Sequence, residues 1–442
     1  MPNKTELWFT KFKWGLAQAF RWLVPGLGIK RWFALVLLGI TIISVGLGIY
    51  LLDFFRNSPD TWWLPIISAL SLKAISRTLR FFIFGTIGLG LIFWGIWGVN
   101  RSLVIPLLRP GKKLVDQVSE YRRREKGPQV VVIGGGHGIS TVLRGLKEYT
   151  HNLTAVVSVA DDGGSSGELR RTLGILPPGD IRNCLAALSN DEDLLTQLFQ
   201  YRFSGSEELS GHSFGNLFIS AMVDITGSFD DAILESGRVL SVYGKVLPST
   251  LENVRLVADV QLPNIGTEIR VVGESQIPEV TGKVRRVWIE PNDVTAFPPA
   301  IQSILNADMI IVGPGSIFTS ILPNLLVPDL LAAFQASRAL KVLVCNIATQ
   351  KGETDQFNIS DHVNSLENNI GREVFDLILC NDNYSTIQPD GVEWVVIDEE
   401  IANDPRIYCA DFIDNQYPWR HDSMKLSKVL MDLLFERTGP LL

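Results

Sequence analysis

Five short apolar runs, rich in β-branched residues, each stop at glycines or small polar residues. The runs occupy 129–133, 153–159, 307–312, 341–345 and 374–380. Buried strands that alternate with helical segments form a parallel sheet covered by helices on both faces. The sequence therefore predicts an α/β domain over 129–442, built on a mostly parallel sheet. In such sheets ligands bind beyond the carboxyl ends of the strands, so the residues after each run are the candidate site.

Residues 244–290 interrupt this alternation. Segments such as KVRRVWIE at 283–290 alternate apolar and polar residues, with little helical pattern between them. Alternation with a period of two is typical of half-buried strands. The pattern predicts a small antiparallel β insertion packed on the main sheet.

The first hundred residues contain two apolar runs, 32–52 and 81–99, each about long enough to cross a bilayer. Lys and Arg concentrate before the first run and after the second, which places both ends on the cytoplasmic side. The pattern predicts a membrane hairpin over 1–108, a basic juxtamembrane linker over 109–128, and a cytoplasmic domain anchored to the inner or plasma membrane. Two buried core helices are the alternative.

Charge is divided unevenly along the chain. Residues 1–127 hold 18 Lys and Arg against 6 Asp and Glu, whereas the remaining residues hold 22 against 41. An acidic domain argues against a nucleic-acid partner, because phosphate backbones bind basic faces. It does not argue against a small phosphorylated ligand, which backbone N–H groups can hold.

The cysteines favour no metal site. Cys184, Cys345, Cys380 and Cys409 are dispersed, with no CxxC spacing, so we expect buried, reduced thiols. No zinc and no haem are expected.

The first strand ends in a glycine-rich loop that opens a helix. Glycines let a backbone turn sharply and approach a phosphate, and a helix N-terminus supplies free N–H groups. The spacing is neither GxGxxG nor that of a Walker A loop, so NAD is not expected; a tight strand-to-helix turn is the alternative. The candidate ligand residues here are Gly134, Gly135, Gly136, His137, Gly138 and Ser140.

A second loop of this kind follows 307–312. It predicts either two phosphate cradles or one diphosphate held from both sides. Its candidate residues are Gly313, Gly315, Ser316 and Thr319. After the next strand, Asn346, Thr349 and Gln350 could contact a base or sugar.

Paired acids follow the second strand. Asp161 and Asp162 could hold Mg²⁺, bond a ribose or base edge, or orient an acceptor hydroxyl, because Mg²⁺ takes one or two carboxylates plus phosphate oxygens. Gly163, Ser165 and Ser166 come next and are candidate ligand residues. An Asx turn with a helix cap is the alternative.

Three further motifs contribute candidates. PPGDIRN supplies Asp180, Arg182 and Asn183, and GHSFGN supplies His212, Ser213 and Asn216. Asp180 and Ser213 are equally suited to cap helices. Arg420, before the last helix, could reach the ligand or form a surface ion pair.

Taken together, these motifs resemble the gluconeogenesis factor family, a UDP-sugar-binding sister of the 2-phospho-L-lactate transferases. The resemblance covers about 129–435 and rests on VVVIGGGHGIS, VADDGGSSGELRR, LPPGDIRNCL, GHSFGN, GPGSIFTSILPNLLVP and VCNIATQKGETD, in the family's order. It implies a Rossmann-like, doubly wound core that binds UDP-N-acetylglucosamine or UDP-glucose. It also implies a role in cell shape and envelope synthesis during gluconeogenic growth.

The resemblance also implies roles for particular residues. Nucleotide phosphates would lie at the two glycine loops, and acceptor and metal at Asp161 and Asp162. Arg420 matches an arginine that contacts the sugar nucleotide. Many relatives have threonine in place of His137, so this chain departs from the pattern there.

Two functions remain open from the sequence. The first is a non-catalytic UDP-sugar sensor, tethered to the membrane beside envelope-synthesis proteins. The second is a Mg²⁺-dependent transferase, resembling 2-phospho-L-lactate transferase and acting on a nucleoside diphosphate-linked donor, with Asp161 and Asp162 as its catalytic pair. A homodimer is compatible with either.

Overall fold

The computed structural model describes residues 122–438 except 190–191, 205–208, 264–266 and 386–391, together with positions 40, 41, 44, 48, 76, 79, 86 and 90. The chain divides into two compact units, Met1–Arg122 and Arg123–Leu442, and only the second is considered below. The predicted hairpin over 1–108 and most of the predicted linker lie outside the described residues. In the described part of the chain, no single helix has the length and apolarity to span a bilayer; one pair bent by 80°, Ile317–Leu325 with Pro328–Ala336, meets both criteria when taken together.

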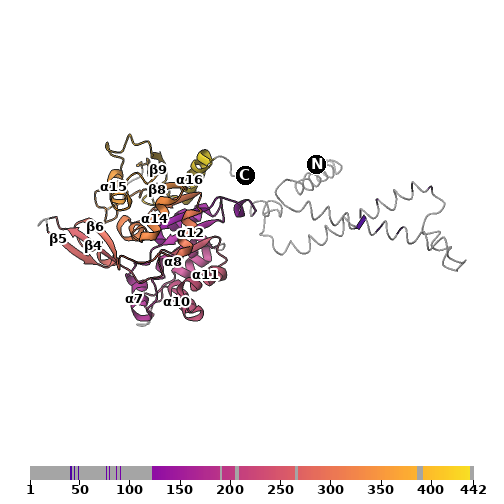
Figure 1. The fold of residues 1–442 in the computed structure, drawn as a ribbon, viewed down its shortest axis with the longest axis horizontal. Helices are drawn as coiled ribbons and strands as arrows, with labels where there is room; N and C mark the ends of the chain where they lie inside the picture. Colours follow the sequence, from indigo (N-terminus) through magenta and orange to yellow (C-terminus); the bar gives the residue numbers. More distant parts are fainter. Residues whose placement is uncertain are drawn as a thin grey trace, which may run out of the picture. The chain divides into compact units, whose positions relative to one another are not determined.

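Seven parallel strands form the centre of the domain, in the order β10-β9-β8-β7-β1-β2-β3 (Figure 1). Their bounds are β1 Val130–Gly134, β2 Leu153–Val157, β3 Lys245–Pro248, β7 Met309–Val312, β8 Leu340–Val344, β9 Leu377–Asn381 and β10 Ile407–Ala410. The predicted parallel α/β sheet is confirmed. From β1 the chain adds β2 and β3 on one side of the sheet, and then β7 to β10 on the other. The order therefore switches between β1 and β7, where sheets of this kind bind ligands.

Helices connect the strands, and their apolar faces bury the sheet. Strands β1 and β2 are buried along their whole lengths, as expected for strands covered on both faces. The helix bounds are α6 Gly136–Leu146, α7 Gly164–Leu173, α8 Gly179–Leu188, α9 Glu192–Gln200, α10 Phe214–Thr226, α11 Phe229–Val239, α12 Pro298–Leu305, α13 Leu322–Leu325, α14 Pro328–Ala336, α15 Ile359–Ile370 and α16 Ser423–Thr438. The π-helical turn η3, Ile317–Ile321, follows β7.

A second, antiparallel sheet is the predicted β insertion, with the order β5-β4-β6. It is formed by β4 Arg255–Gln261, β5 Glu268–Val272 and β6 Lys283–Glu290, and the turn η2, Glu274–Gln276, follows β5. Figure 1 shows these strands projecting at one side of the domain.

The predicted start of the insertion at residue 244 was wrong. Lys245–Pro248 is β3, which pairs in parallel with β2 and belongs to the main sheet. Because β3 is an edge strand, only part of it is buried. Its residues therefore alternate in the same way as those of the antiparallel strands, and the sequence does not separate the two.

Three of the four cysteines are buried. Cys184, Cys345 and Cys380 are buried, as predicted. Cys409 is exposed, because it lies on the edge strand β10, and the prediction of burial was wrong for this residue.

Close packing of α6 against α16 gives a first testable prediction. A Cβ on Gly145 would lie 2.0 Å from Ser427 Oγ and 2.1 Å from the Ser423 carbonyl oxygen. Overpacking of this kind costs about 1–3 kcal/mol, against a helix-propensity gain of about 1 kcal/mol. We expect Gly145→Ala to lower the free energy of unfolding, measured in urea. The matched control is Gly237→Ala in α11, where the nearest atoms are 3.9 Å away and the helix should gain stability. Equal stability of the two variants would contradict this packing.

Candidate functional site

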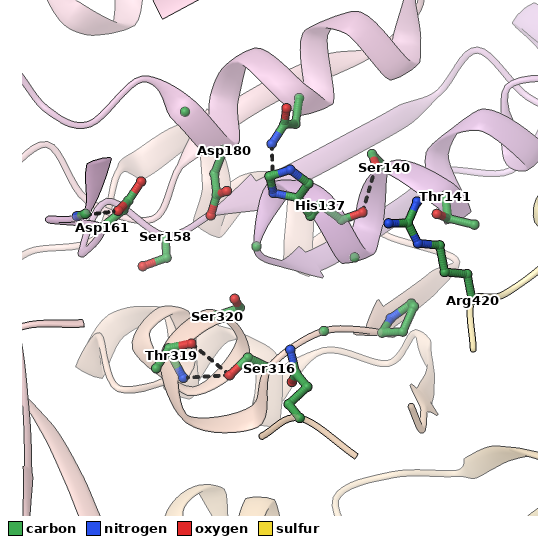
Figure 2. Close-up of a pocket in the computed structure, with 18 of the residues that line it drawn as sticks. His137, Ser140, Thr141, Ser158, Asp161, Asp180, Ser316, Thr319, Ser320 and Arg420 are labelled. Atoms are coloured by element: carbon green, nitrogen blue, oxygen red, sulfur yellow. Dashed lines mark hydrogen bonds between the residues drawn. The ribbon is translucent and has the colours of Figure 1, made fainter. Parts of the chain in front are cut away.

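A cavity of about 860 Å³ opens at the carboxyl ends of β1, β2, β7 and β8, at the switch point of the sheet. Figure 2 shows the loop after β1, with His137, facing the turn that carries Ser316 and Thr319. The predicted site residues that line the cavity are Gly135, His137, Gly138, Ser140, Asp161, Gly163, Ser165, Ser166, Asp180, Arg182, Asn183, Asn216, Gly315, Ser316, Thr319, Asn346, Thr349, Gln350 and Arg420. The structure thus brings together residues from all the predicted motifs.

Six predicted residues do not line the cavity: Gly134, Gly136, Asp162, His212, Ser213 and Gly313. Glycines in the first loop are required by the packing of the loops themselves. A Cβ on Gly136 would lie 2.4 Å from the Asp180 carbonyl oxygen, and one on Gly138 would lie 2.0 Å from that of Pro314. These glycines let three loops meet, which forms the floor of the cavity.

Asp162 has a different place from the one predicted. Its Oδ1 accepts the backbone N–H of Ser275 at 2.9 Å, so this carboxylate holds η2 of the insertion. Asp161, its neighbour, does line the cavity and accepts the N–H of Gly163 at 2.9 Å. The expectation that both acids act on one ligand is therefore replaced by one acid at the cavity and one at the insertion.

Arg182 lies at the back of the site, and its side chain is only 4% exposed. Its guanidinium donates to Ser213 Oγ at 2.5 Å, to Asn216 Oδ1 at 3.1 Å and to Asn183 Oδ1 at 3.0 Å. All three partners are neutral, so no carboxylate is paired directly with this buried cation. Burial and the nearby Arg202 lower the Arg182 pKa.

Arg182 also fixes which way two amides point. A guanidinium can only donate, so the side-chain oxygens of Asn183 and Asn216 must face it. Their Nδ2 groups then point the other way. That of Asn183 lies 3.1 Å from His137 Nδ1, and that of Asn216 lies 3.0 Å from Ser165 Oγ.

His137 is therefore a neutral hydrogen-bond donor. Asn183 Nδ2 donates to its Nδ1, so the ring proton is on Nε2. Burial lowers the His137 pKa, and so do four arginines that line the cavity: Arg182, Arg420, Arg202 and Arg144. This part of the cavity is strongly cationic.

Acids also line the cavity. Burial and the charge of Asp161 raise the Asp180 pKa to about 6. Burial, with the charges of Asp161 and Asp180, raises the Glu274 pKa to about 8. Burial is also the main cause of the raised Asp161 pKa. The cavity is thus lined by four arginines and by three carboxyl groups whose pKa values are raised.

The turn after β7 is held by a residue that the sequence analysis missed. Glu353 is buried and accepts the hydroxyls of Ser316 and Thr319, the latter at 3.0 Å. Asn346 clamps the same loop, since its side-chain amide accepts from and donates to the backbone of Gly315, both at 2.9 Å. Asn346 thus shapes the loop in addition to lining the cavity. The acid in the quoted segment VCNIATQKGETD was the available signal for Glu353.

Other lining residues were also missed, namely Thr141, Arg144, Ser158, Gly164, Gly179, Gln200, Arg202, Glu274, Pro314, Ser320, Ile347, Ala348, Val392, Trp419 and His421. Most are neighbours of predicted residues in the same loops. Glu274 comes from the insertion and has no such neighbour.

Comparison with known proteins identifies the family of the chain. The family described as "2-phospho-L-lactate transferase CofD" matches residues 130–436. This chain belongs to that family. A member from Nostoc sp., named "Putative gluconeogenesis factor", is 43% identical over 430 residues, covering 94% of this chain and 92% of the relative. The "Gluconeogenesis factor" of Bacillus subtilis is 43% identical over 324 residues, covering 70% of this chain and 99% of the relative.

A solved structure of a similar protein agrees with the fold. The crystal structure of a UPF0052-family protein from Bacillus halodurans is 42% identical, with a TM-score of 0.64, and covers 69% of this chain and 99% of that one. The predicted resemblance to gluconeogenesis factors is confirmed. Because the Nostoc match covers 94% of this chain, it includes residues before 129. The Bacillus subtilis match covers 70% of this chain, a share that residues 129–442 alone can account for.

Proposed function

We propose that this chain binds a nucleoside diphosphate sugar, UDP-N-acetylglucosamine or UDP-glucose, in the 860 Å³ cavity. The observation that carries the proposal is that the cavity is lined by both cationic and acidic side chains. Four arginines line it, and three carboxyl groups with raised pKa values line it as well. A diphosphate suits the arginines. Sugar hydroxyls suit the acids, since carboxyl oxygens accept hydrogen bonds from hydroxyls.

Helix N-termini add neutral donors for the phosphates. Helices α6 and α7 start at Gly136 and Gly164, and neither has a side-chain cap. The first N–H groups of a helix have no acceptor within it, and they carry partial positive charge. Both helix starts contribute residues to the cavity wall, so a phosphate there would meet these groups.

Magnesium fits as a companion of the ligand. Within the described residues, no group of three or more His, Cys, Asp and Glu side chains is placed to hold a metal ion. Mg²⁺ needs only one or two carboxylates when phosphates supply the other oxygens. Asp161 is the acid that would hold it, while Asp162 is engaged with Ser275. The ion would neutralise diphosphate charge near the acids.

We propose a regulatory role for this binding. The relatives' name points to gluconeogenic growth, and the resemblance adds cell shape and envelope synthesis. The apolar runs 32–52 and 81–99 would anchor the domain to the inner membrane, with both termini cytoplasmic, beside envelope-synthesis proteins. Support comes from the Nostoc relative, whose match extends into this part of the chain. A homodimer would be compatible with this role.

Thermal unfolding of the full-length chain tests the binding. We expect its Tm to rise with the logarithm of the UDP-N-acetylglucosamine concentration, because a ligand at about 100 times its Kd stabilises the folded state by about 2.7 kcal/mol. UMP and free N-acetylglucosamine, each given alone, should shift the Tm less. An unchanged Tm at millimolar sugar nucleotide would remove the proposal.

The same samples separate a sensor from the alternative, a Mg²⁺-dependent transferase. The family description favours testing for turnover. With Mg²⁺ and a nucleoside diphosphate-linked donor, a transferase releases a nucleoside monophosphate only when an acceptor alcohol is present. Ligand binding without acceptor-dependent release argues against the transferase.

A further inference from the structure

Beside the cavity, Ser165, His212 and Glu168 form a chain of polar contacts that has no part in the proposed binding role. Ser165 Oγ lies 3.0 Å from His212 Nδ1, and His212 Nε2 lies 3.5 Å from Glu168 Oε2. Ser165 lines the cavity, and His212 is buried behind it. A hydroxyl, an imidazole and a carboxylate in this order are the parts of an activated nucleophile.

Arg182 fixes one donor to Ser165. It donates to Asn216 Oδ1, so Asn216 Nδ2 donates to Ser165 Oγ at 3.0 Å. Ser165 keeps its own proton, which it can donate to His212 Nδ1. In that tautomer His212 Nε2 carries the ring proton and faces Glu168. The order of donors thus leaves Ser165 poised to give up its proton.

The surroundings of Ser165 suit attack on a phosphate. It lies in the first turn of α7, where the N–H groups of residues 164–166 have no acceptor within the helix. Such groups stabilise negative charge that develops on a reacting phosphate. Arg182, which shares the cavity wall, adds a full positive charge.

We propose that Ser165 is a nucleophile that takes the sugar phosphate, as a phosphodiester, from the bound nucleoside diphosphate sugar. Ser165 Oγ forms a bond to the β-phosphorus, and its proton passes to His212 Nδ1. The bond from the β-phosphorus to the bridging oxygen breaks, and the nucleoside monophosphate leaves with that proton.

Water completes the reaction. It attacks the seryl phosphodiester while His212 takes its proton, and that proton returns to Ser165 as sugar 1-phosphate leaves. The net change is hydrolysis of the pyrophosphate bond. Glu168 is a positioning residue that acts through His212. The choice of donor rests on the proposed function, whereas the reactivity of Ser165 does not.

A fluorophosphonate probe tests that reactivity on the full-length chain. We expect one covalent label, mapped by peptide mass to Ser165, and none on Ser165→Ala. The matched control, Ser303→Ala on the distant helix α12, should be labelled like the wild type. General-base assistance is worth about 10²–10⁴-fold, so His212→Gln should slow labelling at least about a hundredfold.

Glu168 gives a variant that should keep the fold, because its side chain is 54% exposed. We expect Glu168→Gln to slow labelling without lowering the Tm, and Glu168→Asp to restore part of the rate. The control is Glu235→Gln, an exposed carboxylate on α11. The proposal is overturned if the Glu168→Gln and His212→Gln variants are labelled as fast as the wild type, or if the label is on another residue.

The outcomes distinguish the two proposals. A Tm shift with UDP-N-acetylglucosamine but no label on Ser165 leaves the binding role and removes the nucleophile. Labelling without a Tm shift removes the proposed ligand and keeps the nucleophile. If both hold, wild-type chain incubated with β-³²P-labelled UDP-N-acetylglucosamine should release labelled sugar 1-phosphate, and Ser165→Ala should not.

Discussion

Arg182→Met is expected to weaken binding of UDP-N-acetylglucosamine about a hundredfold. Four hydrogen bonds occupy four of the five guanidinium N–H groups, which leaves one Nη2 N–H for a ligand. A hydrogen bond to a charged group is worth about 1.5–3 kcal/mol, and tenfold in affinity is about 1.4 kcal/mol. Loss of the fixed amide orientations at Asn183 and Asn216 adds to the effect.

The same substitution should lower the free energy of unfolding by about 2 kcal/mol. The oxygens of Ser213, Asn183 and Asn216 would lose their donor, and each buried unsatisfied acceptor costs about 1–3 kcal/mol. Removing the buried charge of Arg182 offsets part of this loss in stability. Calorimetric titration and urea unfolding measure the two effects separately.

Arg238→Met is the control for Arg182→Met. Arg238 is 69% exposed and pairs with Glu235 on the surface of α11. In Arg238→Met, the binding free energy of UDP-N-acetylglucosamine and the free energy of unfolding should each stay within about 0.5 kcal/mol of the wild type. If Arg182→Met bound the sugar nucleotide as tightly as the wild type, the phosphates would not lie beside this guanidinium.

The sheet could be predicted because its signal is local. Strands β1, β2, β7, β8 and β9 are buried on both faces, so each is a continuous apolar run that ends where a polar loop begins. The place of the site could be predicted because ligands bind beyond the carboxyl ends of parallel strands, whereas the strand order was not predicted. Edge strand β3 carries no such run, and its assignment was wrong.

Side-chain direction in the loops could not be predicted. Asp161 and Asp162 are adjacent in the loop between β2 and α7, and their side chains lie in different places. One therefore faces the cavity and the other faces Ser275. The sequence shows two acids, but only the backbone path decides that they cannot both face one ligand.

Contacts made across the fold were also out of reach. The sequence places Arg182 in the first turn of a helix. Its partners Ser213 and Asn216 lie more than thirty residues further along the chain. Glu274 reaches the cavity only because the insertion packs there, and Asp162 holds that insertion in place. Such positions depend on tertiary packing, which local patterns do not carry.

Glu274 gives the largest expected dependence of stability on pH. Burial and the nearby acids Asp161 and Asp180 raise its pKa from the ordinary 4.5 to about 8. The folded chain therefore keeps a proton that the unfolded chain loses above about pH 4.5. This contribution to stability is complete at low pH and is lost as pH rises towards 8, by up to about 1.4 kcal/mol for each pH unit.

Glu274→Gln should remove this loss, because an amide does not ionise. We expect the variant to match the wild type near pH 4.5 and to be more stable by about 2–3 kcal/mol at pH 8, since partial contact with solvent reduces the full effect. Urea unfolding at pH 4.5, 6 and 8 measures the difference, and Glu279→Gln, an exposed position in the same segment, is the control. If the free energy of unfolding changed with pH equally in the wild type and in Glu274→Gln, Glu274 would lose its proton as easily in the folded chain as in the unfolded one. Its carboxyl would then not be confined beside Asp161 and Asp180.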